Sequence, residues 1–571
     1  MSHDHDHAPE AGDGIYDPAG SAEATARFRR LAGRAVDDLL ARNPVLATDL
    51  GEHRHDGVLP DLSADAAAAT VLAMEDLLAE LDALDDLALG TDDAVDLEIL
   101  RSRLSAAAFT AGDLRPHTWN PLVANPGTAV HLLLARDFAP LADRLESVAA
   151  RLAAVPDHLA TARATLGAMP RVHVETAVQQ FGGTAALLRT VLEESLVAQP
   201  ALRGRVDPAR ASAVAAIEEH VGWLSDRLED ADRDPRLGAN LYAGALWHAL
   251  DAETTPAEVR AQAEADLAEL DAEIREVASR LSGEPADAPG LVARVLRQVA
   301  DAAPVDDGSV LGDVAAALER QTAFVRDRDL VSVPDLDVRV IVMPEIHRGV
   351  AVAYCDAPGP LETAAVPTYV AVSPTPAGWD EERVRSFYRE YNGHLLENLT
   401  AHEAMPGHVL QLAHANAARR SRVRAFGRSG PFVEGWAVYA EELMVERGYP
   451  GRGGPDGALA LRLQQLKMRL RTTINAILDV GVHADGMTED EALDLMTASG
   501  HQEEGEAVGK WRRALLTAGQ LPTYYVGYRG VREIVDDLRV LHPDWTDRRV
   551  HDTVLAHGSP APRHLRALLG I

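Results

Sequence analysis

The sequence contains almost no cysteine, few aromatic residues and no long apolar run. Its 571 residues include one cysteine, Cys355, so neither an internal disulfide nor a zinc site made of several cysteines is possible. A lone cysteine is typical of a reducing compartment, and the first residues lack the basic and apolar pattern of a secretion signal, so we expect a cytoplasmic location. No apolar stretch approaches the length of a membrane span, so we do not expect a membrane protein.

Lysine is also rare, and acidic residues dominate the charge. Lysine occurs only at Lys467 and Lys510, and we attribute the preference for arginine to genome composition rather than to function. The 88 aspartates and glutamates outnumber the 55 basic residues, and the net charge is −33. Nucleic acids and anionic membranes bind basic surfaces, so we expect neither as a partner. The acidic charge is either a solvated surface or an attraction for cationic peptides.

What the chain has in abundance is alanine and leucine at helical spacing. With 47% hydrophobic and 5% aromatic residues, it favours a mainly α fold. Residues 1–16 are predicted to be a disordered tail, and residues 17–329 a helical region without catalytic motifs that forms one wall of a cleft. Amphipathic stretches are predicted at roughly 172–196, 207–229, 255–281 and 308–325.

Composition changes near residue 330, where valine-rich segments punctuated by proline and glycine begin. We predict three short strands there, in a small antiparallel β-sheet next to the helix that carries the main motif. Its edge is either residues 351–355 or residues 368–373, and that edge either pairs with a substrate backbone or belongs to a structural hairpin. Residues 330–571 form the predicted catalytic, metal-binding region, in which a helix over residues 380–400 leads into the main motif.

The segment LTAHEAMPGHVLQ carries the strongest chemical pattern. Many zinc hydrolases present two imidazole ligands and a general base as a His-Glu pair followed by a second histidine. Here His408 follows His402 by six positions, which on a regular helix puts the two rings about 120° apart. Pro406 and Gly407 permit a distorted turn that returns His408 to the side of His402. The pattern favours a metal site with Glu403 as its base, but a helix end with a solvent-facing histidine is the alternative.

A third ligand is predicted in the segment PFVEGWAVYAEELMVER. Zincin peptidases that use a glutamate as third ligand carry it on the helix that follows, and Glu434 comes 26 residues after His408. The alternative for Glu434 is a helix-terminal glutamate that is favoured by the helix dipole. Glu441 lies two turns later on nearly the same helix face, where it is expected to orient a ligand histidine.

These motifs resemble those of a known family. HEAMPGHVLQ, VEGWAVYAEEL, LDVGVHADGMTEDEALDLM and GQLPTYYVGY look like the bacterial "domain of unknown function 885" proteins, over roughly residues 330–570. That family is mostly helical and is grouped with zincin-like peptidases that carry an HExxPGH motif. The resemblance implies a large helical, zincin-like (gluzincin-type) metallopeptidase fold with a deep cleft, one Zn²⁺ per chain and peptidase activity. It does not supply a substrate.

Two later segments offer further site residues. Asp479 and His483 are four positions apart on one helix face, where they either orient substrate and stabilise an oxyanion or close a helix end. His483 is also the substitute ligand if His408 does not bind. In GQLPTYYVGYRG the family pattern points to Tyr524 as donor to the oxygen of a tetrahedral intermediate. Arg529 is expected to pair with a substrate carboxylate. A buried aromatic helix face is the alternative for this segment.

Together these residues predict a zinc-dependent hydrolase that cleaves short peptides. The predicted ligands are His402, His408 and Glu434. Glu403 takes a proton from the attacking water, and Tyr524, with His483, stabilises the oxyanion. Two alternatives remain: the same site acting on a non-peptide amide, and a helical binding scaffold whose metal is structural or absent. Glu403 argues against the scaffold, because a structural site needs no base. Neither the oligomeric state nor the position of the cleaved bond is predicted.

Overall fold

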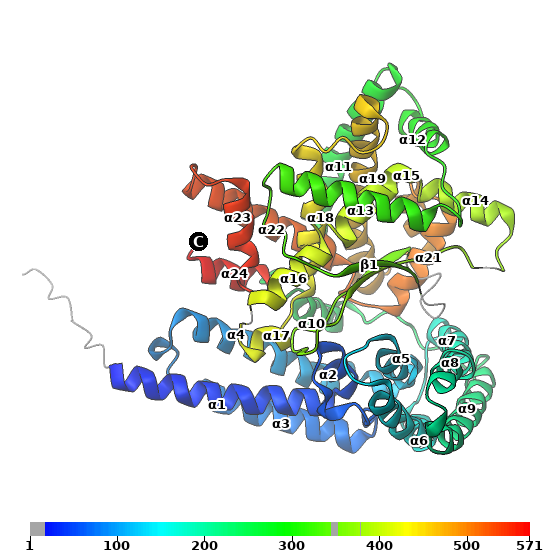
Figure 1. The fold of residues 1–571 in the computed structure, drawn as a ribbon, viewed down its shortest axis with the longest axis vertical. Coiled ribbons are helices and arrows are strands. Elements are labelled where there is room, and N and C mark those ends of the chain that lie inside the picture. Colours follow the sequence, from blue (N-terminus) through cyan, green and yellow to red (C-terminus); the bar gives the residue numbers. More distant parts are fainter. Residues whose placement is uncertain (1–17, 344–351, 377, 419) are drawn as a thin grey trace, which may run out of the picture.

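The computed structural model describes residues 18–343, 352–376, 378–418 and 420–571 (Figure 1). The predicted disordered tail, residues 1–16, lies outside the described residues. Within them the fold is mainly helical, as predicted, with one small sheet. None of the described helices combines the length and the apolar character needed to cross a membrane.

Helices make up most of the chain up to Asp327, as the helical spacing predicts. They are α1 (Pro18–Arg42), α2 (Pro44–Leu50), α3 (Ala64–Asp82), α4 (Thr91–Phe109), α5 (Gly127–Ala135), α6 (Leu141–Thr165), α7 (Arg171–Arg189), α8 (Val191–Ala198), α9 (Arg203–Ser225), α10 (Ala239–Leu250), α11 (Pro256–Ser282), α12 (Leu291–Ala302) and α13 (Val310–Asp327). Short 3-10 or π turns lie between them: η1 (His53–His55), η2 (Asp86–Ala88), η3 (Thr110–Leu114), η4 (Pro116–Thr118), η5 (Pro121–Ala124) and η6 (Pro200–Leu202).

The chain is helical again beyond residue 380, and this part carries the main motif. Its helices are α14 (Glu381–Glu390), α15 (Gly393–Glu403), α16 (His408–Ala418), α17 (Arg422–Phe426), α18 (Gly430–Glu446), α19 (Gly454–Val480), α20 (Glu489–Asp494), α21 (Glu504–Leu516), α22 (Pro522–Leu541), α23 (Asp547–Leu555) and α24 (Pro562–Leu569). Two π segments, η8 (Gly481–Asp485) and η9 (Leu495–Ser499), continue α19 and α20.

The predicted strands form a mixed sheet rather than an antiparallel one. The strands are β1 (Val338–Val342), β2 (Ala353–Asp356) and β3 (Thr368–Val372), in the order β1-β3-β2. β1 pairs with β3 in parallel, and β2 pairs with β3 antiparallel. The antiparallel prediction is therefore wrong for one of the two pairings. Local composition indicates strands, whereas the direction in which two strands pair is decided by the path of the chain between them.

β3 is the central strand, so the predicted edge at residues 368–373 is wrong, and the alternative edge at residues 351–355 agrees with the structure where it is described, in β2. The consecutive β3 residues Val370, Ala371 and Val372 are all buried, which is typical of a strand covered on both faces. Helix α13 packs against β1 and β3 (Figure 1). Helix α15 packs beside β2. The edge strand β2 therefore lies next to the helix that carries the main motif.

The helices on the two sides of residue 329 share hydrophobic cores. α11 and α19 run along each other, and one core joins Ile274 of α11 and Val295 of α12 to Leu470 of α19. α24 packs against α4, and Val423 of α17 belongs to the core of α1, α3 and α4. The change near residue 330 is thus a change in composition, and helix packing continues across it.

α18 and α22 approach each other closely enough that only glycine fits at their contact. A Cβ added to Gly435 would lie 2.2 Å from the carbonyl carbon of Gly527, and one added to Gly527 would lie 1.9 Å from the carbonyl oxygen of Pro431. Both distances are far below van der Waals contact. The two glycines therefore bring the helix that carries Glu434 directly against the helix that carries Tyr524.

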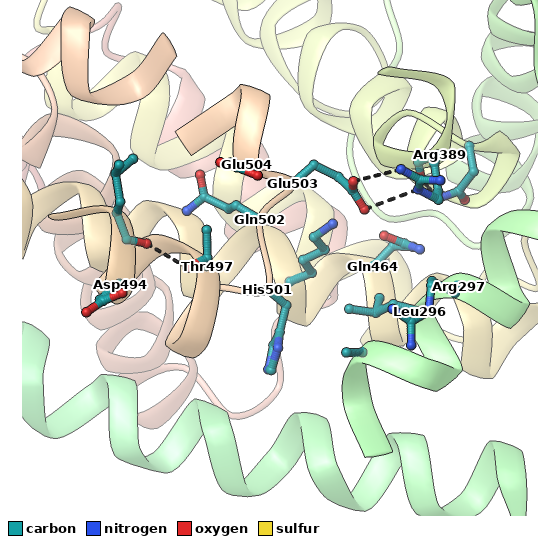
Figure 2. Close-up of a pocket in the computed structure, with 14 residues that line it drawn as sticks. Leu296, Arg297, Arg389, Gln464, Asp494, Thr497, His501, Gln502, Glu503 and Glu504 are labelled. Carbon is teal, nitrogen blue, oxygen red and sulfur yellow. Dashed lines mark hydrogen bonds and ion pairs between the residues drawn. The ribbon is translucent and has the colours of Figure 1, made fainter. Parts of the chain in front are cut away.

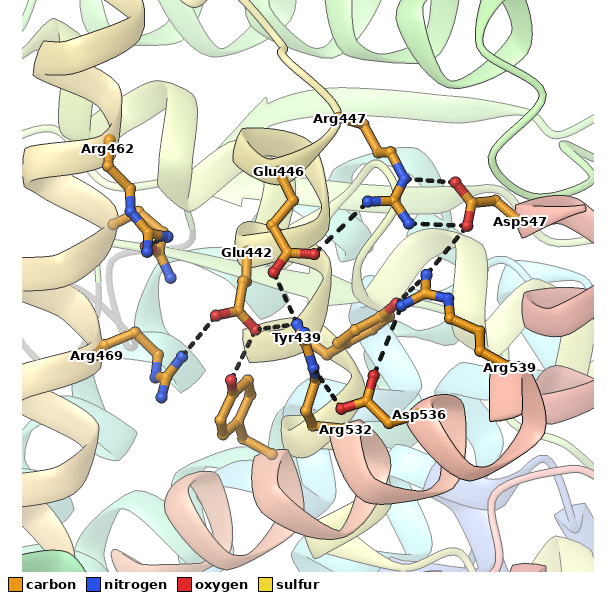
Figure 3. A network of polar contacts seen from close by, with 12 residues as sticks. Tyr439, Glu442, Glu446, Arg447, Arg462, Arg469, Arg532, Asp536, Arg539 and Asp547 are labelled. Atoms are coloured by element: carbon orange, nitrogen blue, oxygen red, sulfur yellow. Dashed lines mark hydrogen bonds and ion pairs between the residues drawn. The ribbon is translucent and has the colours of Figure 1, made fainter. Parts of the chain in front are cut away.

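A network of ion pairs fixes the far end of α18 (Figure 3). Glu442 accepts hydrogen bonds from Tyr528 at 2.7 Å, from Arg469 at 3.0 Å and from Arg532 at 3.0 Å. Arg532 also donates to Glu446, one turn further along α18, at 2.9 Å. Since these partners come from α19 and α22, the network links α18 to both of these helices.

Candidate metal centre

Helix α15 presents His402 and Glu403 at its C-terminal end. The side chain of Asn392 caps the helix by accepting from the backbone N–H groups of His394 and Leu395. Ala404 leaves the helix, with φ −125° and ψ −83°, and α16 begins only at His408. The continuous helix predicted over residues 380–400 is two helices, α14 and α15, and a second break follows Glu403. This second break is the distortion that the six-residue spacing of the histidines predicts.

The break between α15 and α16 requires glycine at position 407. A Cβ there would lie 1.8 Å from the carbonyl oxygen of His402 and 2.4 Å from that of Ala401. The indole Nε1 of Trp436, on α18, donates to the carbonyl oxygen of Pro406 at 2.8 Å. The loop is thus pressed against the end of α15 from one side and anchored to α18 from the other, and His408 is returned to the side of His402.

The three predicted ligands converge. One donor atom from each of His402, His408 and Glu434 lies within 4.8 Å of the other two. Oε2 of Glu434 is 3.5 Å from Nε2 of His402 and 3.5 Å from Nε2 of His408. The imidazole rings are nearly perpendicular, at 87°, with centroids 4.8 Å apart. Two nitrogens and one carboxylate oxygen therefore face a common point.

A second carboxylate orients His402 from behind. Nδ1 of His402 donates to Oε1 of Glu441 at 2.7 Å, and Nδ2 of Asn398 donates to Oε2 of the same carboxylate at 2.5 Å. Because Nδ1 carries the proton, Nε2 of His402 is left as the lone-pair nitrogen that faces Glu434. Nδ1 of His408 is buried and finds no hydrogen-bond partner among the described residues.

The charges of the cluster are strongly coupled. Burial by itself lowers the pKa of His402, but the carboxylates of Glu434 and Glu441 outweigh it and raise that pKa well above its usual value. Burial by itself raises the pKa of Glu434, but His402 and His408 hold it far below its usual value. The cluster therefore favours a positive charge between these side chains.

Glu403 lies beside the cluster and reaches the sheet edge. Its Oε2 accepts a hydrogen bond of 3.1 Å from the backbone N–H of Cys355, on β2. Burial raises the pKa of Glu403 above its usual value, although His408 and His402 oppose the shift. A general base must be held in place without being neutralised, and a single neutral backbone donor to one of its oxygens meets that condition.

Tyr524 opens α22 and lies in the electrostatic field of the cluster. Burial raises the pKa of its hydroxyl, and the carboxylate of Glu434 adds to that shift. His402 and the guanidinium of Arg513 act in the opposite direction. The structure thus places Tyr524 where two of the three predicted ligands, Glu434 and His402, act on its hydroxyl.

His483 and Asp479 make contacts that hold neighbouring segments of the fold together. Nε2 of His483 lies 2.9 Å from the carbonyl oxygens of Ala514 and Thr517, and Nδ1 accepts from the N–H of Leu237 at 3.4 Å. Since both ring nitrogens are engaged, His483 has none to offer to an oxyanion or a metal, which corrects its predicted roles.

Asp479 acts on the segment that leads to Tyr524. Its Oδ2 accepts from the hydroxyl of Tyr242 at 2.8 Å and from the N–H of Gly519 at 2.7 Å. Burial raises the pKa of Asp479 to about 7. Asp479 therefore anchors the turn before α22, and its predicted pairing with His483 is replaced by these two contacts.

Arg529 faces away from the cluster. Its NH1 donates to Oδ2 of Asp266, on α11, at 2.8 Å, and the hydroxyl of Tyr525 donates to the same oxygen at 2.9 Å. Five residues along a helix rotate a side chain by about 140°, so Arg529 and Tyr524 point to different sides of α22. The predicted pairing of Arg529 with a substrate carboxylate is therefore corrected to a pairing with Asp266.

Three contributors to the site are not evident from the motifs: Asn398, the backbone of Cys355, and Arg513. Asn398 precedes His402 by four positions, so helical periodicity does place it on the same face and is a usable signal. Cys355 contributes only a backbone N–H, for which no residue type is informative. Arg513 is recognised only from its effect on the pKa of Tyr524 in the folded chain.

Solved structures with the same fold are known. A candidate lipoprotein of unknown function from Shewanella oneidensis is 28% identical, with a TM-score of 0.79 over 95% of this chain and 100% of its own. A second candidate lipoprotein, from Colwellia psychrerythraea, is 16% identical, with a TM-score of 0.77 over 96% of this chain and 99% of its own, and it shows the fold alone. No curated protein matches the chain. Residues 44–569 match the family described as bacterial protein of unknown function (DUF885), and the chain belongs to that family.

Proposed function

We propose that the chain is a metal-dependent hydrolase that binds one zinc ion and cleaves the peptide bonds of short peptides. The observation that carries the proposal is the convergence of donor atoms from His402, His408 and Glu434 within 4.8 Å. A structural site would not need Glu403, an acid held beside that point by a single backbone N–H.

The donor set fits zinc. Zn²⁺ binds histidine nitrogen and carboxylate oxygen at about 2.0–2.2 Å, so ligand atoms at the corners of a tetrahedron are about 3.3–3.6 Å apart. The two separations of 3.5 Å between Glu434 and the imidazole nitrogens agree with that value. Oε2 of Glu434 is buried and has no hydrogen-bond donor among the described residues, which is the expected state of an atom reserved for a cation.

The mechanism assigns one task to each remaining group. When bound, a divalent metal lowers the pKa of a water molecule towards neutrality and polarises the carbonyl of the scissile amide. Glu403 accepts a proton from the attacking water, whose oxygen bonds to the carbonyl carbon. The same carboxyl then gives the proton to the leaving nitrogen as the carbon–nitrogen bond breaks. The Tyr524 hydroxyl donates to the carbonyl oxygen while that oxygen carries negative charge.

The edge strand β2 gives a substrate a place to lie. Its residues Ala353–Asp356 pair with β3 on one side only, and the N–H of Cys355 on the other side points to Glu403. A peptide added along that side lies beside the proposed base. In this arrangement the N-terminal helices form one wall of a cleft around the site, and residues 330–571 supply the chemistry.

Two alternatives and the location are part of the proposal. The same groups serve a non-peptide amide, which a panel of N-acyl amino acids tested beside short peptides distinguishes. A helical scaffold without catalysis would show no turnover, and if its metal is absent its melting temperature would not change on addition of zinc.

A cytoplasmic location rests on the lone Cys355. The description of the Shewanella relative as a candidate lipoprotein favours a membrane-attached one, so cell fractionation is the direct measurement.

The test of the metal centre is elemental analysis of untagged protein beside a His408→Ala variant. We expect one zinc per chain in the wild type and loss of zinc in the variant. His414→Ala is the matched control, since His414 lies on the same helix but binds the carbonyl oxygen of Ser332 at 2.7 Å. Zinc retained after His408→Ala would overturn the ligand set.

The test of the base is Glu403→Gln. We expect the variant to keep its zinc and to lose at least about 10²-fold in turnover of a peptide library, because the amide cannot accept a proton. Wild-type rates in a zinc-loaded, pure variant would contradict the mechanism.

A further inference from the structure

Two cations on α21 lack the carboxylate partners that most arginines of this protein have. Lys510 and Arg513 lie one turn apart on α21, and no described carboxylate is within ion-pair distance of either. NH2 of Arg513 donates instead to the neutral Oε1 of Gln520 at 2.8 Å. With 88 acidic residues against 55 basic ones in the chain, partners are abundant, so two unpaired cations inside the fold require an explanation.

Lys510 is the stronger anomaly. It is 5% exposed, and its ammonium donates no hydrogen bond to any residue that the structure describes. Lysines are almost never buried unless they are paired. Burial lowers the pKa of Lys510 well below its usual value, and the neighbouring Arg471 lowers it further. The carboxylate that acts on both α21 cations, Glu506, is already bound by Arg471. The surroundings of Lys510 therefore disfavour its charged form as long as no anion is bound, and an anion beside it would restore that form.

This group reaches the candidate metal centre through Tyr524. The guanidinium of Arg513 lowers the pKa of the Tyr524 hydroxyl, which also lies in the field of Glu434 and His402. The turn between α21 and α22 is held by Asp479 through Gly519, so these positions are fixed relative to each other. An anion bound by Lys510 and Arg513 is consequently next to the oxygen donor of the proposed reaction.

The cavity in Figure 2 is a useful contrast, because two of the cations that line it, Arg389 and Lys467, are paired with carboxylates. It has a volume of about 500 Å³ and lies among α12, α14, α19 and α20. Arg389 on its wall donates to Glu503 at 3.0 Å, and Lys467 donates to Glu390 at 2.8 Å. Arg389 and Lys467 thus have carboxylate partners, whereas Lys510 and Arg513 have none among the described residues.

We infer that Lys510 and Arg513 bind the free α-carboxylate of the substrate, on the leaving-group side of the scissile amide. The inference rests on the proposed function and deepens it, because it makes the enzyme act at the carboxyl end of its substrate. The guanidinium fork of Arg513 suits a carboxylate in bidentate fashion, and the Lys510 ammonium adds a point charge. A short peptide and an N-acyl amino acid both present this carboxylate.

The experiment measures binding without turnover, in the Glu403→Gln background. A short peptide is titrated calorimetrically as its free acid and as its C-terminal amide, and an N-acyl amino acid is titrated beside them. We expect the amide to bind about 10- to 100-fold more weakly than the acid, because buried cations lose a charged partner. The relative affinities of peptide and N-acyl amino acid then identify which of the two sources the site prefers.

Variants connect the preference to the two residues. Arg513→Gln and Lys510→Met should each remove most of the preference for the acid, and Arg513→Lys should retain part of it if Arg513→Gln fails to fold. Arg512→Gln is the matched control, since Arg512 points to Thr176 on α7 at 2.8 Å and should leave the preference unchanged.

The outcomes separate this inference from the proposed function. Equal affinity for acid and amide, or a preference that follows an acidic side chain and not the chain end, would overturn the inference even if peptides are hydrolysed. A clear preference for the acid in a protein without turnover or bound zinc would support the carboxylate site and refute the hydrolase.

Discussion

Nδ1 of His402 donates a hydrogen bond of 2.7 Å to Oε1 of Glu441, a carboxylate that is 2% exposed. This contact selects the tautomer of His402 and fixes the direction of its ring. Glu441 is in turn held by Asn398, so the orientation is built from three side chains on two helices. A histidine oriented in this way loses little freedom when it binds a metal.

The first prediction concerns this contact. Glu441→Gln keeps the shape of the side chain but removes the negative charge that polarises His402, so metal affinity should fall by about 10- to 100-fold. A zinc titration against a competing chelator measures the change. Glu446→Gln is the control, because Glu446 lies on the same helix and pairs with Arg532. Equal affinities in the two variants would show that Glu441 does not support the ligand.

The second prediction concerns the loop between α15 and α16. Gly407→Ala places a methyl group 1.8 Å from the carbonyl oxygen of His402, so the loop must move. We expect a loss of about 2–3 kcal/mol in the free energy of unfolding, measured by chemical denaturation, together with weaker zinc binding.

Gly182→Ala is the matched control for Gly407→Ala. Gly182 lies inside α7 with nothing within 4 Å of an added Cβ, so alanine there should stabilise the protein by about 0.5–1 kcal/mol. If Gly407→Ala were as well tolerated as Gly182→Ala, the close approach in the loop would not be real.

Much of the candidate site could be predicted from the sequence, because its spacing is local. His402, Glu403 and His408 lie within seven residues, and Pro406 and Gly407 between them predict the break that the structure contains. Helical periodicity likewise predicts most of the helices before residue 329. The predicted stretch at 172–196 is nevertheless two helices, since the chain turns at Thr190.

The parts that could not be predicted depend on contacts between distant segments. The pairing of Arg529 with Asp266 joins residues 263 positions apart, and the ring of His483 is satisfied by carbonyl oxygens of α21 and the residue that follows it. In both cases the partner is distant in the sequence, so no pattern in the residues around Arg529 or His483 predicts it. The parallel pairing of β1 with β3 has the same origin, because it is set by how the chain returns to the sheet.

The third prediction concerns the network in Figure 3. Glu442→Ala removes the common acceptor of Tyr528, Arg469 and Arg532 and leaves two guanidinium groups without it. Its side chain is 10% exposed, so we expect a loss of about 3–5 kcal/mol in the free energy of unfolding by urea. Glu446→Ala, whose side chain is 30% exposed, should cost less than about 1 kcal/mol. Similar losses in both variants would contradict a special role of Glu442.

The fourth prediction concerns acid stability at the junction of α10, α4 and α24. Asp251 accepts from Arg563 at 2.6 Å and from His564 at 3.0 Å, and Arg103 and His248 lie in its field. Burial by itself raises the pKa of Asp251, but His564 and Arg563 hold it far below its usual value. A carboxyl group with a lowered pKa in the folded state stabilises the fold above its unfolded pKa of about 3.9, and this contribution disappears as the pH falls towards the folded pKa.

Asp251→Asn isolates that charge, because asparagine tolerates the left-handed backbone of position 251, where φ is 48°. The wild type should therefore be more stable than the variant at pH 5–6, and the difference in the free energy of unfolding should shrink as the pH is lowered from about 4 to 3. Denaturation curves at each pH measure it. A difference that stays constant over this range would mean that Asp251 acts through its shape alone, and a difference that grows on acidification would reverse the sign of its electrostatic contribution.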